Sequence, residues 1–287
     1  LGDDLIARGW NDGPTNARWF ATPGGSVSGL LAVGRVVIAT TTQRRVVAYG
    51  AQGEFLWQAE LGDVNKAPPV RLGTQVVVAG LDGSVTAFDP ETGAVAWRGS
   101  TPTEIVLPPV ADRHGVTVVD QAGNLRTYAP DGTVVHSIEV QPPESFTVMD
   151  GLAVVAARSD AVVRGYQLRD GIVVWRTPVV GARVSMVPLG ALVLICRRDA
   201  LVALRASDGA PAWTRPMVPT TLAALDANSA LVSDRTSLYL LDGTGAVRAT
   251  WVTQQADLDA SPQPVLSLQT GEALLVQGTV GYRWRPS

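Results

Sequence analysis

The sequence contains very little lysine and cysteine, and it has no long apolar run. Of its 23 basic residues only Lys66 is a lysine, and this arginine bias, together with the abundance of alanine, valine and glycine, is typical of a high-GC bacterium. Cys196 is the only cysteine, which excludes an intrachain disulfide, and its place at the end of an apolar run predicts a buried, unreactive thiol. The longest apolar runs, 152–157 and 191–196, have six residues each, far fewer than the ~20 of a membrane-spanning helix. We therefore expect no direct membrane insertion.

Strong charge and catalytic motifs are also missing. A net charge of −3 gives no field that would favour nucleic acid or an anionic membrane surface, so we expect neither as a partner. The two histidines, His114 and His136, fit no metal-ligand spacing, and Asp257 with Asp259 lacks the glycine and distal glutamate of a calcium loop. No nucleophile elbow, phosphate loop or dinucleotide fingerprint is present. The sequence therefore predicts no catalytic residue, no metal site and no cofactor.

What the sequence does contain is a long internal repeat. Tryptophans recur in register, and the spacings between successive positions are 38, 40, 39, 39, 38 and 38 residues. The aligned positions are Trp19, Trp57, Trp97, His136, Trp175, Trp213 and Trp251. A period of about 40 residues with several short strands and turns in each unit is the signature of a β-propeller, and no unit shows a helical periodicity.

The sequence of each repeat unit predicts four strands. The first opens after prolines, as at 67–70, 107–110 and 261–265, where a missing N–H does little harm. The second is the most apolar, the third follows a polar turn, and the fourth follows a glycine and carries the tryptophan. The predicted second strands are 36–39, 76–79, 116–119, 152–156, 192–196, 230–232 and 273–276. The glycine supplies the positive φ of a tight turn, and we expect the tryptophan to pack between neighbouring blades.

We therefore predict an all-β fold, a seven-bladed β-propeller of four-stranded antiparallel blades, in a single domain over residues 1–287. The predicted blades are 21–57, 58–97, 98–136, 137–175, 176–213, 214–251, and 252–287 together with 1–20. Gly13 stands as far before Trp19 as Gly245 stands before Trp251, so the N-terminus is expected to supply the missing outer strand of the last blade. The ring would then be closed by the N- and C-terminal strands, with no open sheet edge at the join.

The best-preserved unit also carries a family resemblance. Ala87, Asp89, Thr92, Gly93 and Trp97, in the spacing Ala-x-Asp-x-x-Thr-Gly-x-x-x-Trp, resemble the tryptophan-docking motif of the pyrroloquinoline quinone-like (quinoprotein-type) β-propeller repeat family. The resemblance covers nearly the whole chain, although 165–175 and 203–213 lose the threonine and 127–136 loses the tryptophan. It implies that the structural docking residues are Trp19, Trp57, Trp97, Trp175, Trp213 and Trp251, with Gly93.

The family has an enzymatic and a non-enzymatic branch. Its quinone-dependent alcohol dehydrogenases have eight blades and hold their cofactor between a tryptophan and a disulfide of adjacent cysteines, with calcium nearby. Cys196 alone cannot form that disulfide. The non-enzymatic members include the propeller lipoprotein of the bacterial outer-membrane barrel assembly machinery and various envelope and sensor ectodomains, and the chain is similar to this scaffold branch.

One set of charged residues stands out. The predicted turns between second and third strands carry arginines and aspartates, and in a propeller these turns share a face with the loops between blades, here 100–109, 140–145 and 252–264. Guanidinium groups suit carboxylates and peptide groups, so this face is a candidate partner-binding face, the alternative being an ordinary polar loop surface. Its residues are Arg44, Arg45, Asp120, Arg158, Asp160, Arg197, Arg198, Asp199, Asp234 and Arg235.

The predicted function is that of a non-enzymatic protein-interaction or scaffold propeller. We expect it to be the extracytoplasmic part of a bacterial cell-envelope protein, anchored in the membrane through a segment outside these 287 residues, with a protein partner in the envelope. Two alternatives stay open. One is a divergent quinone-dependent oxidoreductase, or another enzyme such as a lyase with a site in the central channel. The other is a glycan-binding or sensing ectodomain, which exposed aromatic residues on one face would favour.

Overall fold

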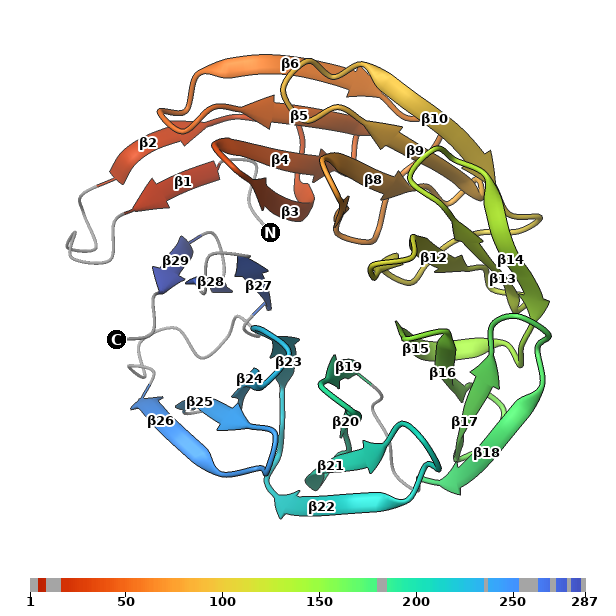
Figure 1. The fold of residues 1–287 in the computed structure, drawn as a ribbon. Helices are drawn as coiled ribbons and strands as arrows, with labels where there is room; N and C mark the ends of the chain where they lie inside the picture. Colours follow the sequence, from red (N-terminus) through yellow and green to blue (C-terminus); the bar gives the residue numbers. More distant parts are fainter. Residues whose placement is uncertain are drawn as a thin grey trace. The chain divides into compact units, whose positions relative to one another are not determined.

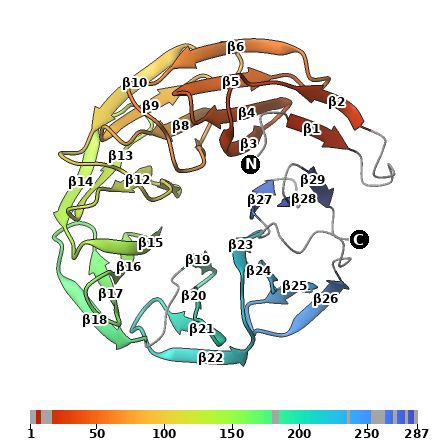
Figure 2. The same cartoon turned by 180° about the vertical axis from the view of Figure 1, so that it is seen from behind.

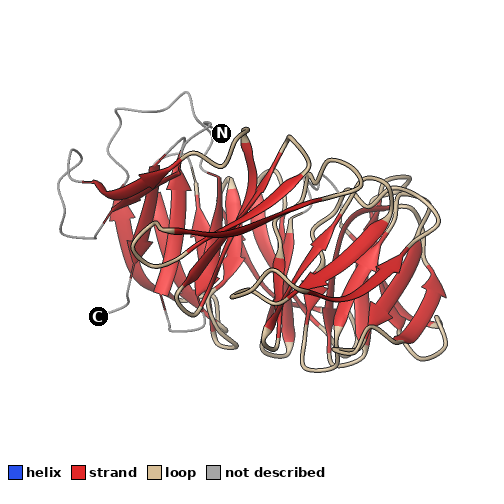
Figure 3. Ribbon diagram, turned by 90° about the horizontal axis from the view of Figure 1, so that it is seen from above, coloured by secondary structure: helices blue, strands red, loops and turns tan. Residues whose placement is uncertain are grey.

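The computed structural model describes residues 5–8, 17–179, 185–234, 237–252, 263–268, 272–277 and 280–284. These residues form 29 β-strands and no helix (Figure 3). The strands follow one another as antiparallel meanders, so that each strand pairs with its neighbour in the sequence (Figure 1). The prediction of an all-β fold made of four-stranded antiparallel sheets is confirmed.

Six sheets of the described residues have four strands each. The first three sheets consist of β3 (Val27–Val33), β4 (Val36–Thr41), β5 (Arg45–Tyr49) and β6 (Phe55–Glu60); β7 (Val70–Leu72), β8 (Gln75–Ala79), β9 (Ser84–Phe88) and β10 (Val95–Ser100); and β11 (Val110–Ala111), β12 (Val116–Val119), β13 (Asn124–Tyr128) and β14 (Val134–Glu139). The next three consist of β15 (Pro143–Met149), β16 (Leu152–Ala157), β17 (Val162–Gln167) and β18 (Val173–Pro178); β19 (Met186–Leu189), β20 (Leu192–Cys196), β21 (Ala200–Arg205) and β22 (Pro211–Pro216); and β23 (Thr221–Ala224), β24 (Ser229–Ser233), β25 (Ser237–Asp242) and β26 (Val247–Val252).

The two ends of the chain form smaller sheets. β1 (Leu5–Arg8) pairs with β2 (Ala17–Ala21), and β27 (Gln263–Leu268), β28 (Glu272–Gln277) and β29 (Val280–Trp284) form a three-stranded sheet. The three C-terminal strands are those that the sequence predicts. No strand of one terminal sheet is paired with the other among the described residues, so the seventh blade and the closure of the ring stay predictions.

The second strand of each four-stranded sheet is apolar because it is buried on both faces. In β8, Val76 and Val78 pack with the sheet before it, whereas Val77 and Ala79 pack with the sheet after it. Successive side chains of a strand point to opposite faces. A strand with neighbours on both faces therefore shows a continuous apolar run instead of an alternating one.

The contacts divide the described sheets into two compact units. The first unit holds β3–β6, β7–β10 and β11–β14, and the second holds the strands from β15 onward, while the turn Leu168–Gly171 between β17 and β18 groups with the first unit. Figure 2 shows the same sheets from behind, each with its strands in chain order. Within each unit, buried clusters join one sheet to the next.

Candidate functional site

Each four-stranded sheet has two distinct ends. In a meander of four strands, the turn between the second and third strands lies at the same end as the loop that leads to the next sheet. Hydrogen bonds join these segments: the Leu61 N–H donates to the Arg44 carbonyl at 2.8 Å, and the Leu81 N–H of the next sheet donates to the Val64 carbonyl at 3.0 Å. We call this end of a sheet the loop end, and the opposite end, with the first–second and third–fourth turns, the hairpin end.

The candidate partner-binding residues of the first unit lie at the loop end. Arg44 is exposed and has a positive φ of 60°, which is an uncommon conformation for a residue with a side chain. Arg45 is half-buried and begins β5. The turn between β4 and β5 therefore holds one of its two arginines in contact with the fold and presents the other to solvent.

Asp120 departs from the prediction, which places it among the surface charges. It is fully buried, and its carboxylate accepts hydrogen bonds from several N–H groups. Its Oδ1 accepts from the backbone N–H groups of Ala122 at 3.0 Å and Asn124 at 2.9 Å, and its Oδ2 accepts from the Thr103 N–H at 3.0 Å. Burial by itself raises the pKa of Asp120, but its hydrogen bonds with Asn124 and Thr103 outweigh that effect and hold the pKa below its usual value. Asp120 therefore fixes the loop at 101–105 to its turn and is not available to a partner.

In the second unit, the carboxylates of the predicted set are held by groups of their own sheets. Asp160 forms an ion pair with Arg164, and Asp199 lies 3.2 Å from Arg197. Asp234 accepts from the Ser237 N–H at 2.8 Å and from the Tyr239 hydroxyl at 2.9 Å. The loop end of this unit therefore presents few carboxylates that are not already engaged.

The arginines of the second unit differ in exposure. Arg158 and Arg198 are exposed, whereas Arg197 is half-buried and its Nε is enclosed without a hydrogen-bond partner. Arg235 and most of the loop at 252–264 lie outside the described residues. The structure therefore places Arg158 and Arg198 in exposed turns at the loop ends of neighbouring sheets.

Four tryptophans of the fourth strands, Trp57, Trp97, Trp175 and Trp213, lie at the hairpin end of their sheets. The Trp57 indole N–H donates to the Pro90 carbonyl at 2.8 Å, and its ring is stacked on Phe88, with ring centroids 5.8 Å apart. Both partners belong to the following sheet. A Cβ added to Gly93 would lie 2.5 Å from Cδ2 of Trp57, so this glycine is needed for the ring of the preceding sheet as well as for its own turn.

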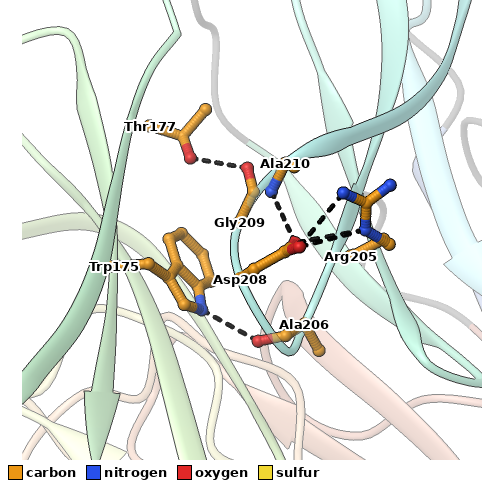
Figure 4. A network of polar contacts seen from close by, with 7 residues as sticks. All are labelled: Trp175, Thr177, Arg205, Ala206, Asp208, Gly209 and Ala210. Carbon is orange, nitrogen blue, oxygen red and sulfur yellow. Dashed lines mark hydrogen bonds and ion pairs between the residues drawn. The ribbon is translucent and has the colours of Figure 1, made fainter.

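The same arrangement recurs along the chain. Trp175 donates to the Ala206 carbonyl at 2.8 Å, and the Thr177 hydroxyl donates to the Gly209 carbonyl at 2.6 Å (Figure 4). Trp213 donates to the Gly243 carbonyl at 3.0 Å. Trp97 covers Gly132 and is stacked on Tyr128 of the following sheet, but its indole N–H donates to Gln75 of its own sheet. The side chains of Trp19 and Trp251 lie outside the described residues.

His136 stands where the other sheets have a tryptophan. It is half-buried. Gly171, the turn glycine of the following sheet, corresponds to Gly93, but a Cβ added to it would lie nearest to Ile138 instead of an aromatic ring. This position lacks the ring stacking and the indole hydrogen bond found at Trp57.

The described residues offer little for catalysis. They contain no group of three or more histidine, cysteine, aspartate or glutamate side chains arranged to hold a metal ion. Cys196 is buried as predicted, and burial raises the pKa of its thiol to about 12, so the thiolate that would react is scarce near neutral pH.

Among the described side chains Phe55 is the only exposed aromatic residue. The described part of the chain contains no helix long and apolar enough to cross a bilayer.

Within each unit, four-stranded meanders that pack face to face, with tryptophans of the fourth strands contacting the following sheet, define a β-propeller repeat protein of the pyrroloquinoline quinone-like type. The chain belongs to the family described as outer membrane protein assembly factor BamB, whose model matches residues 8–158 and 159–282. The resemblance stated from the sequence is therefore confirmed.

Solved structures agree on the fold. BamB from Moraxella catarrhalis has a TM-score of 0.68 at 18% identity, over 94% of this chain and 86% of that one. The computationally designed Ika8 protein has a TM-score of 0.72 at 12% identity, over 91% of this chain and 83% of that one. No curated protein sequence matches the chain. At these identities the two structures support the fold alone.

Proposed function

We propose that this chain is a non-enzymatic scaffold that binds a protein partner in the bacterial cell envelope, in the context of outer-membrane protein assembly. The proposal includes a single seven-bladed propeller over residues 1–287, with residues 1–20 completing the last blade, and an extracytoplasmic location with an anchor outside these residues. Membership of the BamB family supports this role. The family also extends to quinoprotein enzymes, so the choice between the two branches depends on the residues of this chain.

A quinone site of the enzymatic type does not fit these residues. That site requires a disulfide between adjacent cysteines, and Cys196 is the single cysteine of the chain. Its side chain is committed to the packing of β20 against the following sheet. The residues of this chain therefore do not provide the cradle on which the enzymatic branch relies, and we derive no reaction from it.

The observation that carries the scaffold function is the composition of the loop end. Arg158 and Arg198 are exposed there, and Asp160, Asp199 and Asp234 make polar contacts within their own sheets. A guanidinium group donates up to five hydrogen bonds in a planar fork that fits carboxylates and carbonyl groups. The partner segment that suits this face is therefore acidic and extended enough to reach more than one turn.

At the loop end of the first unit, one loop is held in place, which favours binding there without a large ordering cost. In the loop after β10, the Thr103 N–H is bound by Asp120, Ile105 is fully buried, and Gln121 donates to Glu104 at 2.7 Å. A rigid frame that carries short polar loops is the usual location of binding residues.

The test is a capture experiment with two matched variants. The chain would be immobilised, exposed to an envelope extract and crosslinked, and the captured proteins would be quantified by mass spectrometry. The variant Arg158→Glu with Arg198→Glu reverses two exposed charges at the loop end, and we spare Arg197 because a glutamate there would be half-buried. Arg169→Glu, in an exposed turn at the hairpin end, is the control.

The wild type and the Arg169→Glu variant should capture the same partner in equal amounts. The double variant should capture at least about tenfold less of it, because it loses two charge-assisted contacts. Equal capture by the double variant, with its circular dichroism unchanged, would remove the loop end from consideration as the binding face.

A further inference from the structure

The fourth strands are the edge strands of their sheets, and most of them carry groups that discourage pairing with another chain. Edge strands in native proteins are commonly protected by charged side chains or by proline. β10 carries Arg98, β18 carries Arg176 and Pro178, and β22 has a proline at each end as well as Arg215. β26 carries Arg248, whose side chain is 63% exposed.

β14 carries neither arginine nor proline, and its one acidic residue, Glu139, stands at its last position. Its sequence, Val-Val-His-Ser-Ile-Glu, contains no proline, glycine, lysine or arginine. Val134 is 50% exposed and Val135 is 45% exposed, and β-branched residues of this kind favour extended pairing. β6 also lacks arginine and proline, but its exposed ring, Phe55, makes an edge contact with Tyr49. β14 therefore presents the least protected of the described outer edges.

The outer edge of β14 has no strand paired with it among the described residues (Figure 1). β13 pairs with one side of β14 between Val134 and Glu139, with a register irregularity at Val135, so the N–H and C=O groups of β14 that point away from β13 face outward. Such a row of groups is a template for one further strand, with main-chain hydrogen bonds for affinity and side chains for selectivity.

Charge defines the kind of strand that fits. Asp131, in the turn before β14, is exposed, and its hydrogen bonds with Thr133 lower its pKa, so it is ionised at neutral pH. Glu139 is exposed at the other end of the strand. Val134 and Val135 therefore lie on a strand flanked by two carboxylates, with His136 and Ser137 in its middle and no lysine or arginine on the strand itself.

We infer that the outer edge of β14 is a docking site for an extended segment of a partner protein that is apolar in its middle and basic at both ends. This inference adds a second contact to the proposed scaffold function, but it uses a different surface from the loop end. A strand about as long as β14 would add to the sheet and cover Val134 and Val135.

The probe is a fluorescein-labelled peptide, Lys-Val-Thr-Val-Thr-Val-Thr-Lys, whose middle is β-branched with its valines on one face and whose ends are basic. We expect saturable binding by fluorescence anisotropy and slower amide hydrogen exchange over residues 134–139. The matched peptide, N-methylated at all six of its middle residues, keeps the side chains but cannot donate main-chain hydrogen bonds from either edge of its middle, so it should bind at least about tenfold more weakly.

Three protein variants locate the site. Val135→Arg introduces the type of residue that guards the other edges and should weaken the unmodified peptide at least about tenfold, whereas Val135→Thr keeps a β-branched side chain and should bind it nearly as well. Val174→Arg makes the same change on β18, where Arg176 is already present, and should have no effect. Each variant would be used only after its melting curve has been matched to the wild type.

Equal binding of the two peptides, or equal binding by Val135→Arg and the wild type, would overturn the inference, and so would exchange protection confined to another strand. A wild-type dimer that Val135→Arg dissociates would also overturn it, because a second copy of the chain would then be the occupant. The variant with Arg158→Glu and Arg198→Glu should bind the peptide normally, so the outcome here is separate from that of the loop end.

Discussion

Replacing Trp57 with alanine should destabilise the protein by about 3–5 kcal/mol, the range observed when a large buried aromatic residue is truncated. The structure supports the upper part of this range. The side chain is 7% exposed and stacked on Phe88, and a buried tryptophan removes about 150–250 Å² from water, which at ~25 cal/mol per Å² corresponds to roughly 4–6 kcal/mol. The change also leaves the buried Pro90 carbonyl without its indole donor, at a further cost of about 1 kcal/mol.

The sharper test combines this change with Gly93→Ala. Alone, Gly93→Ala forces a side chain into a turn with φ of 73°, which costs about 1–2 kcal/mol, and it also places a Cβ against the Trp57 ring. When the ring is absent, the backbone cost stays but the collision disappears. The cost of Gly93→Ala should therefore be smaller in the Trp57→Ala background, with a coupling energy of about 1 kcal/mol or more.

The assay is urea unfolding followed by circular dichroism for the wild type, both single variants and the double variant, with comparison at equal m-values. Additive effects within about 0.5 kcal/mol would refute the reasoning, because the two residues would then act independently and the glycine would serve its own turn alone. Gly34→Ala is a suitable control. Gly34 has a positive φ of 58°, but a Cβ added there meets no atom within 4 Å, so its cost should be the same with or without Trp57.

Four further outcomes are expected. Asp120→Asn should lower the free energy of unfolding by about 1–3 kcal/mol at pH 7, because the amide cannot accept hydrogen bonds from all the N–H donors around Asp120. Since the pKa of Asp120 is lowered in the folded state, this advantage of the wild type is present above about pH 4 and fades as the pH falls through the folded-state pKa. Urea unfolding at several pH values would measure it. Cys196 should stay unmodified by a thiol reagent at pH 8 and react fully in urea, and rapid reaction of the native protein would contradict its burial. Pyrroloquinoline quinone with calcium should produce neither a visible absorbance band nor a thermal shift, and a clear shift would favour the enzymatic branch. Deleting residues 1–20 should lower the melting temperature by several degrees if they complete the last blade, and an unchanged melt would argue against that closure.

The strands were predictable because each unit repeats the same local signals. The apolar run at 192–196 coincides with β20, and the polar turn Leu81–Asp82–Gly83 leads into β9 as expected. These features depend on residues close together in the sequence. The positive φ of the glycines before the fourth strands is confirmed for the same reason, as at Gly93.

The contacts between sheets could not be read from one unit at a time. Trp57 and Gly93 are partners from neighbouring sheets, although the sequence motif pairs Gly93 with Trp97. Asp120 looks like other turn aspartates, and only the approach of Thr103 from the preceding loop encloses it. One local signal could have indicated a bound carboxylate, namely the four-residue spacing from Asp120 to Asn124. The backbone N–H and the side-chain amide of Asn124 both donate to the Asp120 carboxylate.

In the proposed function, stability and binding depend on opposite ends of a sheet. The tryptophans contact the third–fourth turns of the hairpin end, as Trp175 does at Ala206, whereas the exposed Arg198 lies between β20 and β21 at the loop end. Effects at sites that share no partners are expected to add. Trp175→Ala should therefore lower the melting temperature without changing the affinity of the folded protein for its partner, and Arg198→Glu should do the reverse. Affinity measured well below both melting temperatures separates the two effects, and a loss of affinity in Trp175→Ala would mean that the loop end depends on the tryptophan contacts.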